Sequence, residues 1–270
     1  MERKRGHRMN VLQNLTAFYN QLAPDSTYRN VCRGILEHLD EAAAGTIYDL
    51  AELTNSSRTT IWRMIQKLGY ESFTDFHHEL KRAVKNYTYY NRILPAEECT
   101  DINHVKKALL EQMRNAHEFM ENNLEPDMVE RLSEQLYEAD KVRFYSPFQS
   151  SSIYSLQQNL AMSGVETAYY CLLPEILKDS QQLTEKSIVF INTIEHAETM
   201  DLRDMFWQIK QKGATILGIA SEKSKYAGYI DQNIIEGKHR NVVEGVMIFD
   251  MFFYMLSEVY RMKYIDEVYE

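Results

Sequence analysis

Apolar residues recur at helical spacing through the first third of the chain. Between residues 27 and 86 they form one-sided stripes with a period of about 3.6 residues, which predicts a series of amphipathic helices. Gly69 follows one of these stripes as a helix-ending residue, and Ser72 with Asp75 forms the pattern of a capping box that opens the next helix. We therefore expect an all-α domain over residues 1–86.

The pattern changes after a segment without helical spacing at residues 87–102, which contains Pro95 and which we assign to a linker. Two further helices are expected near 103–121 and 127–139, followed by short apolar runs that alternate with helical stretches. The expected strands are 141–146, 165–170, 187–193, 214–220 and 232–237, and the expected helices between and after them are 151–163, 200–212 and 242–262. This alternation indicates βαβ units, so we expect an α/β domain with a doubly wound parallel sheet over residues 103–270.

Composition supports a globular chain and narrows its chemistry. The 270 residues are 44% hydrophobic and 26% charged. No apolar run approaches the roughly 20 residues that cross a bilayer, and no apolar segment of a signal peptide follows the basic start, so we expect a cytoplasmic protein without a membrane partner. The three cysteines and eight histidines are scattered and show no ligand spacing, so we expect no metal site, no disulfide framework and no cofactor.

The negative charge is concentrated in the second part of the chain. Residues 1–92 hold 13 Lys and Arg against 10 Asp and Glu, a net charge of +3, whereas residues 93–270 hold 17 against 29, a net charge of −12. A mildly basic N-terminal domain is compatible with nucleic acid as its partner, but it is weak evidence by itself.

Stronger evidence lies in the stretch "TIYDLAELTNSSRTTIWRMIQKLG", residues 46–69, which indicates a helix, a tight turn and a second helix. Asn55 suits a left-handed turn position, and Ser57 suits an N-cap. The second helix has an apolar side, formed by Ile61, Met64, Ile65 and Leu68, and a polar side, formed by Thr59, Arg63 and Lys67. Recognition helices of helix-turn-helix domains are built in this way.

The polar side predicts the contacts of such a helix with DNA. Arg58 and Thr59, in the first turn, are expected to reach base edges, and arginine can pair bidentately with guanine. Arg63 and Lys67 lie further along and are expected to hold phosphates. The alternative is an ordinary solvated helix face in a helical bundle.

The residues Ser57, Thr60, Arg63 and Lys67-Leu68-Gly69-Tyr70, followed by Phe73 and Phe76, resemble the N-terminal domain of the RpiR family of bacterial transcriptional regulators. The resemblance implies a helix-turn-helix domain joined to a sugar isomerase (SIS) domain, a doubly wound α/β fold that usually binds a phosphosugar. It also implies a double-stranded DNA operator as partner, control of carbohydrate-related genes, and a place for Ser57 and Thr60 among the DNA-binding residues. Because one recognition helix makes few contacts, we expect a homodimer or homotetramer that presents several.

The SIS-like domain departs from the family pattern where a phosphate would bind. Tyr145 and Pro147 stand where glycines belong after the first strand, and the loop "INTIEHAET", residues 191–199, lacks a glycine and carries Glu195 and Glu198. Polar residues that remain as candidates for binding an effector are Ser146, Ser150, Ser151, Asn192, Thr193 and Thr199. The serine cluster is equally compatible with simple helix capping.

Three roles of this domain stay open: sensing a phosphosugar with altered residues, sensing a different small molecule, or dimerisation alone. The alternative from a different functional class is an enzyme, namely a SIS-type sugar-phosphate isomerase or binding enzyme. Isomerisation needs a positioned base, and the local candidates are Glu195, His196 and Glu198 in a polar loop. We therefore expect a regulator without catalytic residues.

Overall fold

The computed structural model describes residues 11–85, 93–146, 150–192, 202–220, 226–236 and 242–265. Contacts divide the chain into two compact units, one lying mainly within residues 1–91 and one built mostly from residues 92–270. The linker that we assign to 87–102 is described only from residue 93, so the domain boundaries stay a prediction. Among the described helices, none combines the length and the hydropathy that crossing a bilayer requires.

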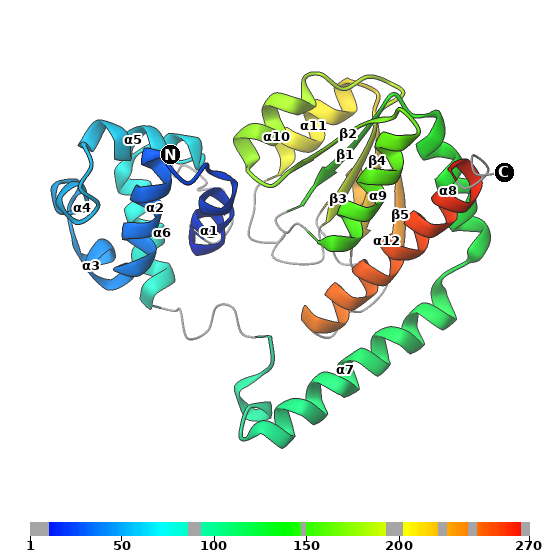
Figure 1. Ribbon diagram of the computed structural model, residues 1–270, viewed down its shortest axis with the longest axis horizontal. Helices are drawn as coiled ribbons and strands as arrows, with labels where there is room; N and C mark the ends of the chain where they lie inside the picture. Colours follow the sequence, from blue (N-terminus) through cyan, green and yellow to red (C-terminus); the bar gives the residue numbers. More distant parts are fainter. Residues whose placement is uncertain are drawn as a thin grey trace. The chain divides into compact units, whose positions relative to one another are not determined.

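The first unit is a bundle of helices, drawn in blue to cyan in Figure 1. Its elements are α1 (Val11–Gln21), α2 (Thr27–Glu37), α3 (Leu39–Ala44), α4 (Ile47–Leu53), α5 (Arg58–Lys67) and α6 (Phe73–Lys85). The completely buried side chains at its centre include Leu15, Ile35, Leu50, Ile61 and Phe76. The all-α expectation is confirmed. The sequence pattern did not predict α1, nor the break at His38 that separates α2 from α3.

Local signals in this unit act as predicted. Asn55 adopts a left-handed conformation with φ of +47° in the turn between α4 and α5, and Gly69 has φ of +86° after α5. Ser57 caps α5 by accepting a hydrogen bond from the Thr60 N–H at 3.1 Å. These residues determine where α5 begins and ends.

The second unit begins with α7 (Ile102–Asn123) and α8 (Pro126–Glu138) and continues as an α/β domain. Its strands are β1 (Lys141–Tyr145), β2 (Glu166–Tyr170), β3 (Ile188–Asn192), β4 (Thr215–Ala220) and β5 (Gln232–Glu236). Its other helices are α9 (Ser151–Met162), α10 (Leu173–Ser180), α11 (Arg203–Gln211) and α12 (Val242–Tyr264), with short 3-10 turns at Ala96–Glu98 and Ala227–Tyr229.

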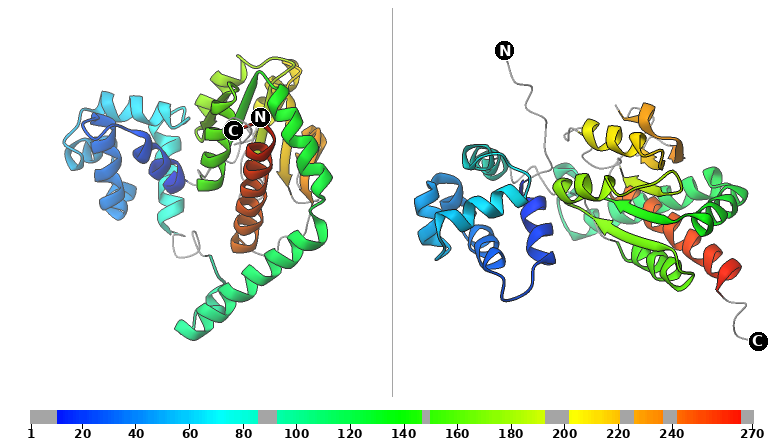
Figure 2. Two further views of the ribbon diagram at one scale, coloured as in Figure 1. Left: turned by 45° about the vertical axis from the view of Figure 1, so that its right-hand side comes forward. Right: turned by 90° about the horizontal axis from the view of Figure 1, so that it is seen from above.

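All five strands pair in parallel in the order β2-β1-β3-β4-β5. Helices α9 and α12 cover one face of the sheet, whereas α10 and α11 cover the other (Figures 1 and 2). The doubly wound parallel sheet predicted from the sequence is confirmed. Helix α10 was not predicted.

Aromatic side chains fill the core between the sheet and α12. The rings of Phe144 on β1 and Phe190 on β3 stack with centroids 5.1 Å apart, and the ring of Phe253 on α12 meets Phe190 edge-on at 5.2 Å. Phe252 and Phe253 are completely buried. Much of the apolar run at 245–260 is therefore core.

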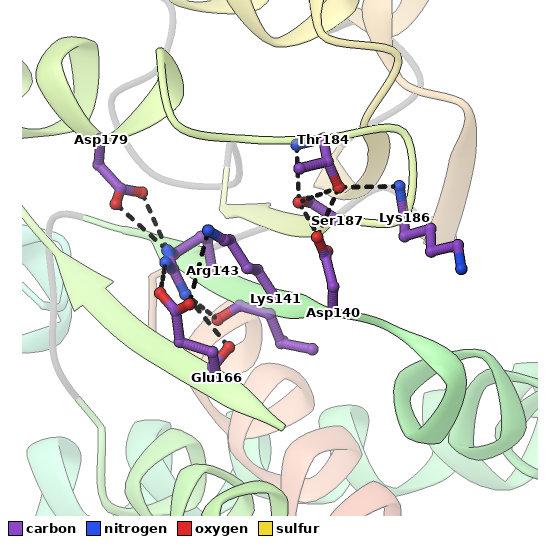
Figure 3. A network of polar contacts seen from close by, with 9 residues as sticks. Asp140, Lys141, Arg143, Glu166, Asp179, Thr184, Lys186 and Ser187 are labelled. Atoms are coloured by element: carbon purple, nitrogen blue, oxygen red, sulfur yellow. Dashed lines mark hydrogen bonds and ion pairs between the residues drawn. The ribbon is translucent and has the colours of Figure 1, made fainter. Parts of the chain in front are cut away.

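The opposite face of β1 carries a buried charge network (Figure 3). The Arg143 side chain is only 3% exposed, and its Nε donates to Oδ2 of Asp179 on α10 at 3.1 Å, while its guanidinium also pairs with Glu166 on β2. The Tyr145 hydroxyl donates to the same Asp179 oxygen at 2.6 Å. Burial by itself lowers the pKa of Arg143, but the two carboxylates outweigh it and raise that pKa above its ordinary value. The network attaches α10 to the sheet.

Asn55 offers a test of the turn that positions α5. The side chain is exposed and its backbone is left-handed, a conformation that costs an alanine roughly 1 kcal/mol and a glycine nothing. We expect Asn55→Ala to lower the free energy of unfolding by about 1 kcal/mol and Asn55→Gly to change it by a few tenths at most. Urea unfolding of both variants measures this difference, and an equal loss in the two would contradict the role of φ.

Candidate nucleic-acid interface and effector site

Helix α5 separates its apolar and polar residues as the sequence predicts. Ile61, Met64 and Ile65 are completely buried, because α5 packs against α2, α4 and α6. The side chains of Arg58, Thr59, Arg63 and Lys67 are all exposed. The residues proposed for DNA contact thus share the outward side of one helix.

The first turn of α5 is held by its own hydroxyl groups. The Ser57 and Thr60 hydroxyls lie 2.9 Å apart and hydrogen-bond each other, in addition to the cap. Residues Arg58 and Thr59 therefore stand at a well-defined helix N-terminus, where the unpaired N–H groups and the helix dipole favour an anion. This end of α5 suits a DNA phosphate close to the bases that Arg58 would contact.

Two aromatic residues beside α5 were missed by the sequence interpretation. The guanidinium carbon of Arg58 lies 4.4 Å from the ring centroid of Tyr48 on α4, and the Lys67 ammonium lies 5.8 Å from the Tyr28 ring on α2. No spacing rule links Tyr48 to Arg58, because their contact depends on the angle between α4 and α5.

The described candidates for effector binding lie at the carboxyl edge of the sheet. Strands β1 and β3 are neighbours, with Tyr145 opposite Ile191, and the order β2-β1-β3-β4-β5 makes this the point where the strand order reverses. Doubly wound sheets bind ligands at such a switch point. Ser146 follows β1, Asn192 ends β3, and Ser150 and Ser151 begin α9.

The remaining candidates, Thr193 and Thr199, lie outside the described residues, as do Pro147, Glu195, His196 and Glu198. Ser146 is buried, and its carbonyl accepts a hydrogen bond from the Tyr169 hydroxyl at 2.6 Å. In the ranges that the structure covers, no group of three or more His, Cys, Asp or Glu side chains gathers in a way that would hold a metal ion.

The serines at the start of α9 bond to α12. Ser150 is the N-cap and accepts from the Ile153 N–H at 3.3 Å, and its hydroxyl lies 2.7 Å from that of Ser152. Ser152 in turn donates to Oδ1 of Asp250 at 2.6 Å, and the Ser151 hydroxyl lies 2.6 Å from that of Tyr254. A carboxylate of the protein therefore stands close to the helix N-terminus that would attract a phosphate.

The same pairing continues along the two helices. Asn159 on α9 donates to the Ser257 carbonyl at 3.0 Å and lies 2.9 Å from its hydroxyl, and Ser163 hydrogen-bonds Tyr260. Polar groups on facing sides of α9 and α12 thus satisfy one another over the length of α9. These hydrogen bonds hold α9 and α12 side by side.

Residues 9–87 match the model of a helix-turn-helix domain of the rpiR family. The first unit of the chain is a helix-turn-helix domain of the rpiR family. It is therefore a DNA-binding domain, and α5 is the second helix of the helix-turn-helix pair.

Solved structures resemble this chain only distantly. The Vibrio vulnificus NanR protein, solved in complex with ManNAc-6P, is 16% identical, with 96% of this chain and 92% of that chain covered and a TM-score of 0.44. The sugar isomerase domain of an RpiR transcription factor from Sphaerobacter thermophilus is 14% identical, covering 60% and 90%, with a TM-score of 0.44. A putative sugar-phosphate isomerase from Listeria monocytogenes is 12% identical, covering 62% and 95%, with a TM-score of 0.45. None of the curated proteins matches the chain.

At the described part of the switch point, Asp250 brings a negative charge to hydroxyls that could otherwise donate to a phosphate, and two like charges at short range repel each other. Hydroxyl or amino groups of a ligand would suit Asp250 better than a dianion. Asp250 is the one acid within the apolar stretch 245–256, and a charge in such a stretch is a sequence signal for a buried polar contact.

Proposed function

We propose that this rpiR-type regulator binds an operator by placing α5 in the major groove of double-stranded DNA. The observation that carries the proposal is the exposed polar side of α5, opposite a completely buried apolar side, within the domain that the family model matches. Arg58 and Thr59 read base edges, whereas Arg63 and Lys67 hold phosphates. Ser57 and Thr60 support the first turn. In this proposal the protein acts in the cytoplasm of a bacterium and controls carbohydrate-related genes, as expected for a member of the rpiR family.

The second unit serves self-association in this proposal. Helices α7 and α12 expose large apolar side chains, with Leu110 and Met113 on α7 each more than 40% exposed. Val246, Tyr254 and Met255 on α12 are exposed to a similar extent. A homodimer or homotetramer would cover part of this surface and present two or more copies of α5 to operator half-sites.

In this proposal, the switch point does not bind common phosphosugars. The Ser152–Asp250 hydrogen bond supports it, together with the replaced glycines and the missing N–H of Pro147. Two roles then remain for the domain, sensing of a different small molecule and dimerisation alone. We assign it no isomerase activity, and a test with aldose and ketose phosphates would reveal one.

The first prediction separates base contacts from phosphate contacts. Arg58→Ala should reduce discrimination against the wrong base by about 1–3 kcal/mol at one operator position, because a bidentate pair is lost. Lys67→Ala should weaken binding to all sequences and lower the salt slope by about one. Fluorescence anisotropy on a selected operator and its single-base variants measures both quantities. Lys186→Ala, which removes one exposed charge from the second unit, is the matched control, and unchanged binding by all three variants would refute the docking of α5.

The second prediction concerns the molecular mass of the protein in solution. Light scattering at micromolar concentration should give at least twice the 31.8 kDa of one chain. Replacing both Leu110 and Met113 by Asp should lower the mass, because charges would be placed on the contact surface. Trp207→Asp on α11 replaces an apolar side chain elsewhere that is 62% exposed, and it should leave the mass unchanged. A monomeric wild-type chain would rule out this assembly.

The third prediction concerns the effector. Common phosphosugars at millimolar concentration should cause no thermal shift, whereas a ligand of the native state adds about 2.7 kcal/mol of stability at one hundred times its Kd. Asp250→Asn removes the repelling charge and should allow a measurable shift if that charge excludes the phosphate. A shift in the wild-type protein that Ser150→Ala or Thr193→Ala abolishes would show that phosphate binding is retained.

A further inference from the structure

Tyr48 is an exposed aromatic residue whose position bears on how Arg58 meets DNA. Its side chain is 63% exposed, so its ring contributes little to the core of the first unit. The Arg58 guanidinium carbon lies over this ring, 4.4 Å from its centroid. That distance is well inside the range of about 6 Å for cation–π attraction.

Both partners of this contact are held by helix caps. The Asp49 N–H donates to the Thr46 hydroxyl at 3.4 Å and the Thr46 N–H donates to Oδ2 of Asp49 at 2.7 Å, which together form a capping box at the start of α4. The Tyr48 N–H also donates to the Thr46 hydroxyl, at 3.3 Å. The hydrogen bonds from the Thr46 N–H and hydroxyl group lower the pKa of Asp49 below its ordinary value. On the other helix, the Ser57 cap holds the first turn that carries Arg58. The ring and the guanidinium therefore extend from two fixed backbone positions.

The ring restrains the guanidinium without using its hydrogen-bond donors. An exposed arginine carries about 2 kcal/mol of rotamer entropy, part of which is lost when it binds a base. A carboxylate partner would reduce this freedom but would accept the N–H groups that guanine needs. Within the described residues, no carboxylate forms an ion pair with Arg58. A ring attracts the charge through its face, and the N–H donors of the guanidinium stay available for O6 and N7 of guanine.

We propose that Tyr48 is a positioning residue for base reading: it holds the Arg58 guanidinium in the orientation that meets the operator. The inference rests on the proposed docking of α5 and adds a determinant of specificity from the first helix of the pair. Removal of the ring should cost discrimination at the base that Arg58 reads, by about two- to fivefold, which corresponds to an exposed cation–π contact.

The test uses the full chain and an operator selected with the wild-type protein. Affinities of wild type, Tyr48→Leu, Tyr48→Phe, Arg58→Ala and the double variant Tyr48→Leu/Arg58→Ala are measured on the operator and on every single-base variant at one salt concentration. Tyr48→Leu should lose discrimination at the position that Arg58→Ala affects, and Tyr48→Phe, which keeps the ring, should retain it. In the double variant the loss at that position should equal the loss of Arg58→Ala alone, because Tyr48 acts through Arg58.

Three outcomes would overturn the inference. If Tyr48→Leu weakens binding equally on all sequences and adds to Arg58→Ala, the tyrosine contacts phosphate or supports the fold, and thermal unfolding of the variant distinguishes these two roles. If Tyr48→Leu changes nothing while Arg58→Ala relaxes one base position, the positioning role is absent and the docking of α5 stands. If Arg58→Ala leaves every base preference intact, base reading by Arg58 fails and the role of Tyr48 fails with it.

Discussion

Burial of the apolar side of α5 is the constraint on which the proposed DNA-binding surface depends. Each completely buried side chain among Ile61, Met64 and Ile65 stabilises the unit by about 1.5–3 kcal/mol. Rotation of the helix about its axis would expose these residues and lose that energy. Arg58, Thr59, Arg63 and Lys67 therefore remain outward, whether or not DNA is present. The same three apolar residues hold the bundle together and orient the surface that we assign to DNA.

In the second unit, apolar and polar side chains are separated by the two-residue period of a β-strand. Side chains alternate along β1, so Val142 and Phe144 enter the core beneath α9 and α12, while Arg143 and Tyr145 lie on the side of Asp179. A buried arginine is tolerated there because Asp179 and Glu166 compensate its charge. One strand thus supplies an apolar contact to one helical layer and a charged contact to the other.

The two units differ in whether their polar side chains already have partners within the protein. On α5 the proposed DNA contacts stay exposed, and the Tyr48 ring restrains Arg58 without taking its donors. At the switch point, by contrast, hydroxyl groups of α9 bond to Asp250 and Tyr254 of α12. Polar groups that already have good partners gain little from a ligand, because the exchange breaks as many hydrogen bonds as it makes. The hydroxyl groups at the start of α9 are therefore less available to a ligand than the exposed polar side chains of α5.

The sequence by itself determined the helical and strand periods, the parallel α/β class, the turn at Asn55, the cap at Ser57 and the outward residues of α5. These features depend on neighbours within about four positions or on a repeating pattern, and both are visible in the chain. Only the tertiary structure decided which distant residues meet. Arg143 and Asp250 stand out in the sequence as charges within apolar runs, yet nothing in the sequence names Asp179 or Ser152, which are 36 and 98 positions away, as their partners. The contact of Tyr48 with Arg58 is of the same kind, because the packing of whole helices brings these residues together. Helices α1 and α10 were likewise found only in the structure.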